Sequence, residues 1–156
     1  AINDAPVAAT GLSGTTSEDQ SVVVTLSGSD VDGDALSFSL DTDALNGSVT
    51  INGTVATYTP NQDFNGDDSF TYSVSDGELL DSADVIISIE SVNDAPVLAI
   101  VSDISFDEDG TSLISLSASD VDGDELFYNI AGGTNIISNI SGPKFKALPS
   151  VVSVSW

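Results

Sequence analysis

The sequence predicts an all-β protein in which an antiparallel β-sandwich of about seven strands occurs twice in tandem. Three observations predict this fold. Apolar and polar residues alternate in short segments, Gly, Asn, Asp and Pro separate these segments, and the sequence repeats at an offset of ninety residues. No helical period competes with the alternation, so we expect strands and turns throughout.

The first unit contains the alternating segments of one sandwich. A first strand is expected after Pro6, and the core-facing residues of the later strands are Val22, Val24 and Leu26; Leu36, Phe38 and Leu40; Val49 and Ile51; Val55 with Tyr58; Phe70, Tyr72 and Val74; and Val85, Ile87 and Ile89. Asn52-Gly53 predicts a hairpin turn because both residue types tolerate positive φ. About seven strands in about ninety residues is the size of an immunoglobulin-like sandwich.

Two motifs recur at the same offset and define the domain organisation. Asn3-Asp4-Ala5-Pro6-Val7 recurs as Asn93-Asp94-Ala95-Pro96-Val97, and Ser29-Asp30-Val31-Asp32-Gly33-Asp34 recurs as Ser119-Asp120-Val121-Asp122-Gly123-Asp124. A repeat of this length is a domain. We therefore predict a complete domain over residues 1–94 and a second, truncated repeat over 95–156, which is clear to about residue 130 and atypical over 142–156.

The second repeat is incomplete at its end. Val152-Ser153-Val154-Ser155 resembles Tyr72-Ser73-Val74-Ser75, so we predict that the sixth strand of the sandwich, strand F, is present and that the last, strand G, is missing. An altered tail or a sequence boundary explains this better than a designed half-domain. The missing strand would leave an open sheet edge, and a homodimer paired through the second repeat is therefore a hypothesis.

Composition excludes several classes of function. The 156 residues contain 25 Asp and Glu against 2 Lys and Arg, a formal net charge of −23. This sign excludes binding to nucleic acid or anionic membranes, and no apolar run is long enough to span a bilayer. The lack of His and Cys excludes Ser-His-Asp and Cys-His relays, the usual zinc ligands and disulfides. With 40% hydrophobic residues, the chain is nevertheless expected to fold.

The acidic residues are expected to gather at the domain ends. Successive antiparallel strands alternate in direction, which places the loop at Asp30 and the loop at Asp76 at the same end as Asp4. The loop at Glu18 lies at the other end, where the chain leaves for the second repeat. The predicted metal ligands are Glu18, Asp19, Asp30, Asp32, Asp34, Asp76, Asn93, Asp94, Asp120, Asp122 and Asp124.

Such clusters need a counter-charge. Two carboxylates about 4 Å apart repel by roughly 1 kcal/mol in water, and the only cationic residues, Lys144 and Lys146, lie near the end of the chain. An all-oxygen site with several carboxylates suits Ca²⁺ better than transition metals or Mg²⁺. Asp30-Val31-Asp32-Gly33-Asp34 is not an EF-hand loop, because its Gly is fourth and strands flank it.

The sequence resembles the bacterial cadherin-like tandem repeats of large secreted and cell-surface proteins such as calcium-dependent adhesins. The residues that carry the resemblance are the Val92-Asn93-Asp94-Ala95-Pro96 junction, the Asp30–Asp34 loop, Pro60-Asn61 with Phe64-Asn65-Gly66, Ser69-Phe70-Thr71-Tyr72 and Val74-Ser75-Asp76-Gly77. The resemblance implies calcium at the domain junction, bound by Glu18, Asp94, Asp120 and Asp122. Cadherins also place an acidic motif before strand F, where this sequence has only Asp67 and Asp68.

The favoured function is a non-enzymatic spacer or adhesion module of a secreted or cell-surface bacterial protein. Its expected partners are calcium and a polysaccharide or another cell-surface protein. The alternative is a polysaccharide-binding accessory module of a secreted carbohydrate-active enzyme, which an exposed aromatic strip would support. Hydrolysis by paired carboxylates is the weakest interpretation, because metal binding explains Asp-rich loops better and no pocket-forming insertion is evident.

Overall fold

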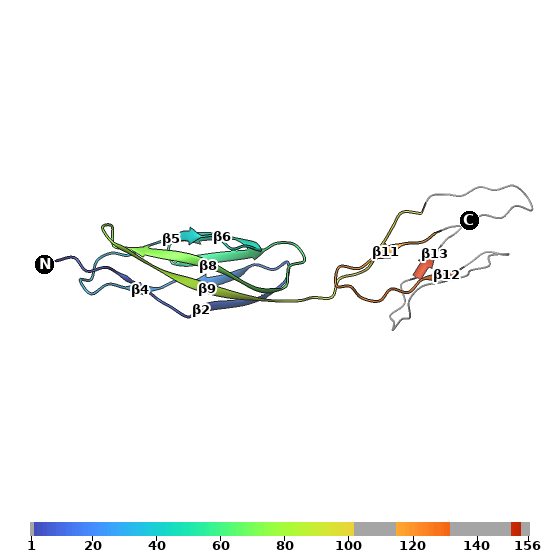
Figure 1. Ribbon diagram of the computed structural model, residues 1–156, viewed down its shortest axis with the longest axis horizontal. Helices are drawn as coiled ribbons and strands as arrows, with labels where there is room; N and C mark the ends of the chain where they lie inside the picture. Colours follow the sequence, from blue (N-terminus) through green and yellow to red (C-terminus); the bar gives the residue numbers. More distant parts are fainter. Residues whose placement is uncertain (1, 102–114, 132–150, 154–156) are drawn as a thin grey trace, which may run out of the picture. The chain divides into compact units, whose positions relative to one another are not determined.

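The computed structural model describes residues 2–101, 115–131 and 151–153, and within them every regular element is a β-strand. The chain forms two compact units, Ala1–Val92 and Asn93–Trp156. The described residues include no apolar helix of the length that would cross a membrane. The first unit is a two-layer sandwich (Figure 1), which confirms the predicted fold class.

Nine strands make up the first unit. They are β1 (Val7–Ala8), β2 (Leu12–Ser17), β3 (Val22–Thr25), β4 (Gly28–Ser29), β5 (Ser37–Thr42), β6 (Gly47–Asn52), β7 (Val55–Pro60), β8 (Gly66–Ser75) and β9 (Leu80–Glu90). One layer has the strand order β2-β9-β8-β5 and the other β3-β7-β6, with a short separate pair β1-β4.

The expected first strand is divided between two sheets. Its first part, β1, pairs antiparallel with β4, whereas its second part, β2, pairs parallel with β9. Gly11 lies between the two parts at φ 77°, a conformation that residues with a side chain rarely adopt, and this allows the chain to bend from the β1-β4 pair into the β2-β9-β8-β5 sheet. The parallel pairing of β2 with β9 therefore departs from the antiparallel pairing that the sequence predicts.

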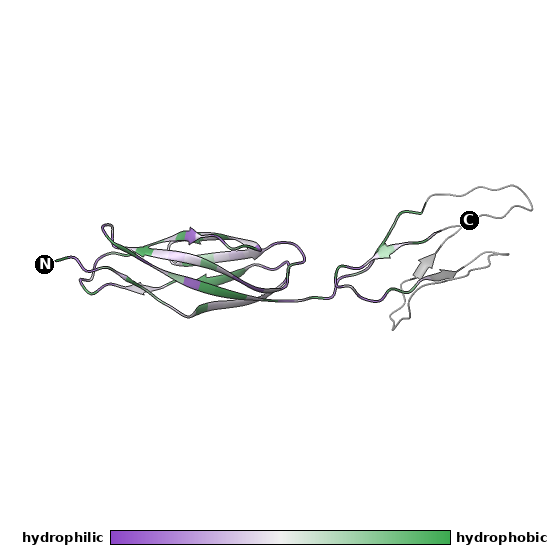
Figure 2. Ribbon diagram, in the orientation of Figure 1, coloured by the Kyte–Doolittle hydropathy of each residue, from purple (hydrophilic) through white to green (hydrophobic). Residues whose placement is uncertain are grey.

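The core lies between the layers and follows the predicted alternation. From Asp68 in β8 and from Ala83 in β9, every second residue is buried, and Figure 2 shows both hydrophobic and hydrophilic stretches along β9. The exception is Val55, which is 41% exposed. Because Ala56 and Tyr58 face the core, the period of two directs Val55 outward.

The hairpin between β6 and β7 is confirmed, with its turn displaced by one residue. Asn52 is still paired with Val55, so Gly53 and Thr54 form the two-residue loop. Gly53 has φ 58°, and Thr54 is not among the residues with positive φ. A single positive φ at the first loop position is typical of a type II′ turn, whereas the prediction placed Asn52 and Gly53 at the two central positions.

Two buried tyrosines fasten the strands to neighbouring loops. The Tyr72 hydroxyl, on β8, lies 2.8 Å from the carbonyl oxygens of both Ala9 and Ser27. Burial raises the pKa of Tyr72, so the hydroxyl remains a donor at neutral pH. These contacts tie β8 to the segments that follow β1 and β3.

The second tyrosine forms a buried polar cluster with Asp68. The Tyr58 hydroxyl donates to Asp68 Oδ2 at 2.9 Å, and burial, reinforced by this carboxylate, raises the pKa of Tyr58. A Cβ atom at Gly47 would lie only 2.5 Å from the Tyr58 ring. Glycine is thus required at position 47 because the ring packs directly on the backbone there.

The start of the second unit repeats the first unit at the offset seen in the sequence. Its strands are β10 (Val97–Leu98), β11 (Ala118–Ser119), β12 (Asn129–Ala131) and β13 (Val151–Ser153). Val97 pairs with Ser119 as Val7 pairs with Ser29, so the register of β10-β11 is that of β1-β4.

The end of the second unit differs from the prediction. Strand F of a sandwich should pair antiparallel with residues 129–131, whereas β12 and β13 are parallel. The pairing of Val152 and Ser153 therefore differs from that expected of strand F, and residues 154–155 lie outside the described residues. Parallel pairing needs the long connection that these two strands have. Most of the atypical tail lies outside the described residues. The prediction that strand G is missing falls there as well.

Candidate metal sites

The loop after β4 is organised around one carboxylate. Asp30 Oδ1 accepts hydrogen bonds from the backbone amides of Asp32 (2.8 Å), Gly33 (3.0 Å) and Asp34 (3.2 Å). Such side-chain-to-backbone bonds are characteristic of aspartate in turns. Gly33 completes the loop at φ 81°. The Asp-Gly pattern thus folds this segment by itself into a tight turn.

The same turn leaves carboxylate oxygens facing one another. Oxygen atoms of Asp30, Asp32 and Asp34 lie within 4.8 Å of each other. Asp30 Oδ2 is buried and has no hydrogen-bond partner among the described residues. A buried carboxylate oxygen without a donor is costly. This set of hard oxygen donors fits a cation such as Ca²⁺. Asp30 Oδ2 and an oxygen of Asp32 or Asp34 would bind it together.

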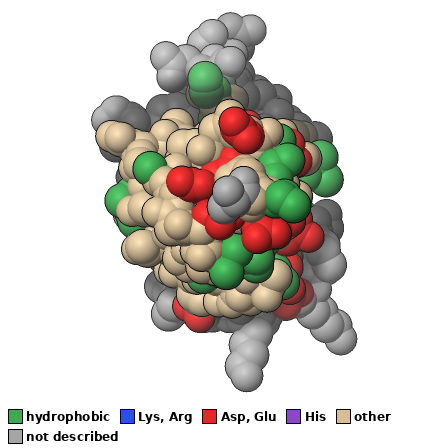
Figure 3. Space-filling model, turned by 90° about the vertical axis from the view of Figure 1, so that its left-hand side faces the viewer, with side chains coloured by type: hydrophobic (Ala, Val, Ile, Leu, Met, Phe, Trp, Pro, Cys, Tyr) green, Lys and Arg blue, Asp and Glu red, His purple; other side chains and the backbone are tan. Residues whose placement is uncertain are grey.

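The start of the chain adds to this loop, as strand alternation predicts. The backbone amide of Asp4 donates to Asp32 Oδ2 at 2.8 Å, and Asn3 Nδ2 donates to Asp76 Oδ2 at 3.0 Å. Figure 3 shows the acidic side chains gathered on this end of the first unit. The predicted grouping at this end is therefore confirmed.

Asp76 contributes mainly to the structure of its own loop. Its Oδ1 accepts from the amides of Glu78 and Leu79, each at 2.7 Å. These bonds, that to Leu79 foremost, hold the pKa of the Asp76 carboxyl below its ordinary value. Because Asn3 occupies Oδ2, both oxygens already have partners within the chain. Asp76 has less capacity for a metal than Asp30.

At the other end, Glu18 lies directly after β2 and is only 4% exposed. Its Oε1 accepts a hydrogen bond from the Val92 amide, and Asn65 Nδ2 approaches Oε2 at 3.5 Å. The carboxylate is thus held beside the last residue of the first unit. Asp19, the neighbouring predicted ligand, accepts instead from the amide of Asp63 at 3.2 Å and is exposed.

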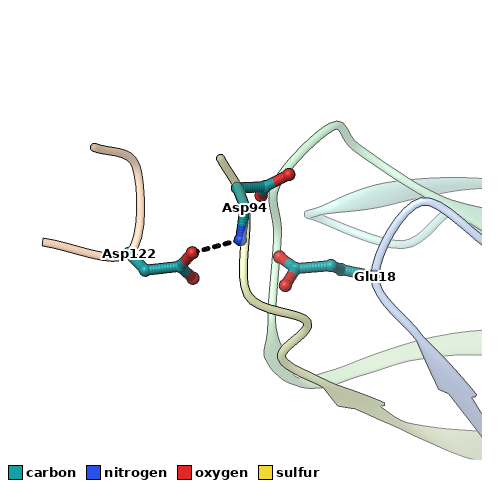
Figure 4. Close-up of side chains that lie close together, drawn as sticks. All are labelled: Glu18, Asp94 and Asp122. Carbon is teal, nitrogen blue, oxygen red and sulfur yellow. Dashed lines mark hydrogen bonds between the residues drawn. The ribbon is translucent and has the colours of Figure 1, made fainter. Parts of the chain in front are cut away.

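The second unit reproduces the first loop. The Asp94 amide donates to Asp122 Oδ2 at 2.6 Å (Figure 4), the counterpart of the bond from Asp4 to Asp32. Asp124 donates its amide to Asp120 Oδ1 at 3.1 Å, and Gly123 has φ 76°.

Asn93 differs from its counterpart Asn3. Its Nδ2 donates to the carbonyl oxygen of Asp94 at 3.0 Å, whereas the amide of Asn3 reaches Asp76. The position ninety residues beyond Asp76 would be 166, which the 156-residue sequence does not contain.

Three residues at these ends were missing from the predicted ligands. Asn3 and Asn65 stand within motifs that the sequence singles out, and their polar side chains were the available signal. Asp81 accepts from the Ala8 amide at 2.8 Å and joins β9 to β1. No repeat could indicate Asp81, because its counterpart would again fall beyond the chain.

The two acids before strand F have structural roles. Asp67 faces outward and accepts from the Ser88 hydroxyl at 2.8 Å, whereas Asp68 faces the core and binds Tyr58. Both belong to β8, because the strand begins at Gly66.

The fold defines an immunoglobulin-like domain with acidic loops at its ends. The family model of the bacterial Ig domain matches residues 3–88, more than half of the chain, and the chain belongs to this family. Domains of this family are typically non-catalytic and usually occur in extracellular or surface proteins. No curated protein matches the sequence.

Several solved structures are similar to parts of the chain. Human protocadherin-24 EC1-2 is 18% identical, with a TM-score of 0.48 over 76% of this chain and 62% of that one. The glycoside hydrolase family 107 endo-fucoidan hydrolase MfFcnA4 is 23% identical, with a TM-score of 0.45 over 56% of this chain and 14% of that one. The chain thus spans a small fraction of the hydrolase.

Proposed function

We propose that this chain is a calcium-binding tandem-repeat module of a secreted or surface-exposed bacterial spacer or adhesion protein, and that it has no catalytic role. In this proposal Ca²⁺ bound at the domain junction stiffens the chain of domains. The observation that carries the proposal is the repeated start of each domain. Asp4 with Asp32, and Asp94 with Asp122, form the same amide-to-carboxylate bond beside the same Asp-Gly turn.

The backbone that follows Val92 connects the Glu18 contact to the start of the second domain. The Val92 amide is hydrogen-bonded to Glu18, and Asp94 follows two residues later. Two residues of extended backbone span at most about 7 Å. The Asp94 backbone is in turn bonded to Asp122. Chain connectivity therefore favours one cation shared by Glu18, Asp94 and Asp122, with Asp120 and Asp124 in the loop beside it.

Calcium suits this donor set because it accepts many oxygen ligands in a flexible arrangement. Extracellular modules bind it with a Kd of about 10⁻⁴ to 10⁻³ M. At a hundredfold excess over Kd, binding stabilises the bound state by roughly 2.7 kcal/mol. A contribution of this size is sufficient to hold a short linker in one conformation. The equivalent cluster at Asp30 is then half of a site that another domain would complete.

The alternative, a polysaccharide-binding accessory module, receives less support from the first unit. Sugar-binding surfaces commonly use exposed aromatic rings, and no described aromatic side chain is exposed. Tyr58, Phe70 and Tyr72 are core residues. Gel retardation by neutral and acidic polysaccharides tests this function separately from calcium.

The decisive experiment is calcium titration by calorimetry on the full chain, comparing the wild type with Asp122→Asn. We expect the variant to lose one binding event or to weaken it at least tenfold. Asp84→Asn is the matched control, because Asp84 is exposed on β9 and bonded to Thr71 at 2.7 Å. Equal heats for all three proteins would overturn the junction site.

Small-angle scattering tests the mechanical consequence. Removal of calcium with a chelator should leave the first sandwich folded and broaden the distribution of distances between the units. We expect Asp122→Asn to resemble the chelated wild type even when calcium is present. Superimposable wild-type profiles with and without chelator would contradict the proposal.

A further inference from the structure

The outer face of the β3-β7-β6 sheet carries no charged side chain. In register across the sheet, Val23 pairs with Thr57 and Thr57 with Thr50, while Val55 pairs with both Thr25 and Asn52. We name this surface the hydroxyl face; it consists of Ser21, Val23, Thr25, Ser48, Thr50, Asn52, Val55, Thr57 and Thr59. All of these are exposed except Thr57, which is partly exposed.

The rest of the first unit is acidic. The outer face of the other sheet carries Asp67, Asp84 and Glu90. The two ends carry the clusters around Asp30 and Glu18, and residues 1–92 contain no Lys or Arg to balance them. Of the two outer sheet faces of the first unit, the hydroxyl face is therefore the one on which a second acidic protein would meet no opposing carboxylate.

We propose that the hydroxyl face docks a second copy of this chain, sheet against sheet. Charge restricts where a second copy can dock, because a molecule of net charge −23 is repelled by its own copies wherever carboxylates face each other. A hydroxyl both donates and accepts hydrogen bonds, so a face of hydroxyls is complementary to itself. That property is what a two-fold symmetric contact requires.

The valines supply the apolar part of the contact. Val23 is 59% exposed and Val55 41% exposed, and both project on the same side from neighbouring strands of one sheet. Face-to-face sheets pack about 10 Å apart, which lets such side chains interdigitate. One polar bond is already satisfied within the face, since the hydroxyls of Ser21 and Thr59 lie 2.8 Å apart.

The size of the face predicts a weak contact for a single domain. Three strands at their usual spacing cover about 14 Å by 20 Å, roughly 300 Å², against about 800 Å² per partner in stable complexes. Tandem repeats would multiply the contact through effective concentration. In the sequence, the positions ninety residues after Ser21, Val23 and Thr25 are Thr111, Leu113 and Ser115, which are also uncharged.

The test is sedimentation velocity of the full chain up to about 1 mM, at low and high salt. We expect reversible self-association that strengthens with salt, because the Debye length falls from about 10 Å at 0.1 M to about 3 Å at 1 M and screens the repulsion elsewhere. Val23→Glu should weaken this association at least tenfold.

The matched control is Ile86→Glu on the opposite face. Ile86 is 55% exposed on β9, so the two substitutions place the same charge at comparably exposed positions of opposite sheets. We expect Ile86→Glu to change the association less than twofold. Thr50→Glu on β6 is a second variant of the hydroxyl face, with circular dichroism confirming the fold of each protein.

Three results would overturn the proposal. The first is a monomer at every concentration and salt. The second is association that Val23→Glu and Ile86→Glu affect equally, which includes a dimer formed through the second repeat. The third is a monomer that neutral polysaccharide gels retard in a Val23-dependent manner, which would assign the face to a glycan.

Discussion

Two regions of the first domain hold a carboxylate away from water, and they treat it differently. In the core, Asp68 accepts four hydrogen bonds: from the amides of Leu45 (3.3 Å), Asn46 (2.9 Å) and Ser69 (2.9 Å), and from the Tyr58 hydroxyl (2.9 Å). In the loop after β4, Asp30 accepts three, all on Oδ1, and Oδ2 is left buried.

The difference separates a structural carboxylate from a candidate ligand. Both oxygens of Asp68 are satisfied by donors of its own chain, so the group has no need of an ion. Asp30 satisfies its loop with one oxygen and presents the other to Asp32 and Asp34, which are also anionic. Among many acidic residues, the arrangement of donors therefore identifies those with remaining capacity for a cation.

The largest expected effect comes from removing the core carboxylate. Asp68→Ala leaves the buried Tyr58 hydroxyl and the part-buried amides of Leu45, Asn46 and Ser69 without their acceptor. Because each buried donor left unsatisfied costs about 1–3 kcal/mol, we expect a loss of about 3 kcal/mol or more in the free energy of unfolding. Urea denaturation of the full chain measures this loss.

The neighbouring acid provides the control for that experiment. Asp67→Ala removes an exposed side chain whose partner, Ser88, can bond to water instead. We expect a change within about 0.5 kcal/mol. Equal losses for Asp67→Ala and Asp68→Ala would show that the buried hydrogen bonds contribute nothing specific.

A smaller effect is expected when the loop carboxylate is neutralised. Asp30→Asn keeps an oxygen for the three loop amides and removes the negative charge at the second oxygen. In chelator we expect the free energy of unfolding to change by less than about 0.5 kcal/mol. At a tenfold excess of calcium over the Kd of the Asp30 site, the cation bound at that site should add about 1.4 kcal/mol to the wild type and less than half of that to the variant.

Chemical denaturation with and without calcium measures both quantities. Asp84→Asn serves again as the control and should gain as much as the wild type, because Asp84 lies on the outer sheet face away from the loop. An identical calcium response of wild type and Asp30→Asn would remove the distinction between Asp30 and Asp68.

The sequence predicts the strands well, because burial on one face imposes a period of two. The same period of two also predicts that Asp68 is buried. Asp68 shares the parity of Phe70, Tyr72 and Val74, so alternation along β8 already directed it into the core. The cadherin resemblance instead placed Asp67 and Asp68 before strand F, although both belong to β8. Val55 was misplaced by the opposite error, since its apolar character was given more weight than the parity of Ala56 and Tyr58.

The candidate sites were predictable where the sequence repeats and unpredictable where distant elements meet. The loops at Asp30 and Asp120 are alike because the same local pattern folds the same turn twice. The contacts of Asn65 with Glu18, and of Asp81 with Ala8, join positions far apart in the chain. Residue type and spacing carry no information about such partners.

Asp76 gives the smallest expected effect and lies between the two extremes. It is a loop carboxylate, like Asp30, but both of its oxygens have partners, like those of Asp68. Its pKa is held below the ordinary value of 3.8, chiefly by the Leu79 and Glu78 amides. A depressed folded-state pKa contributes stability at pH values above 3.8, and this contribution disappears as the pH falls through the folded-state pKa.

We therefore expect Asp76→Asn to be slightly less stable than the wild type at neutral pH, and the difference to shrink as the medium is acidified below pH 4. Carboxyl NMR titration reports the same property directly as a midpoint below 3.8. A midpoint at or above that value would mean that the loop amides do not bind the charged form more strongly than water does. The Asp76 carboxylate would then still be able to bind a cation. It would rank with Asp30 rather than between Asp30 and Asp68.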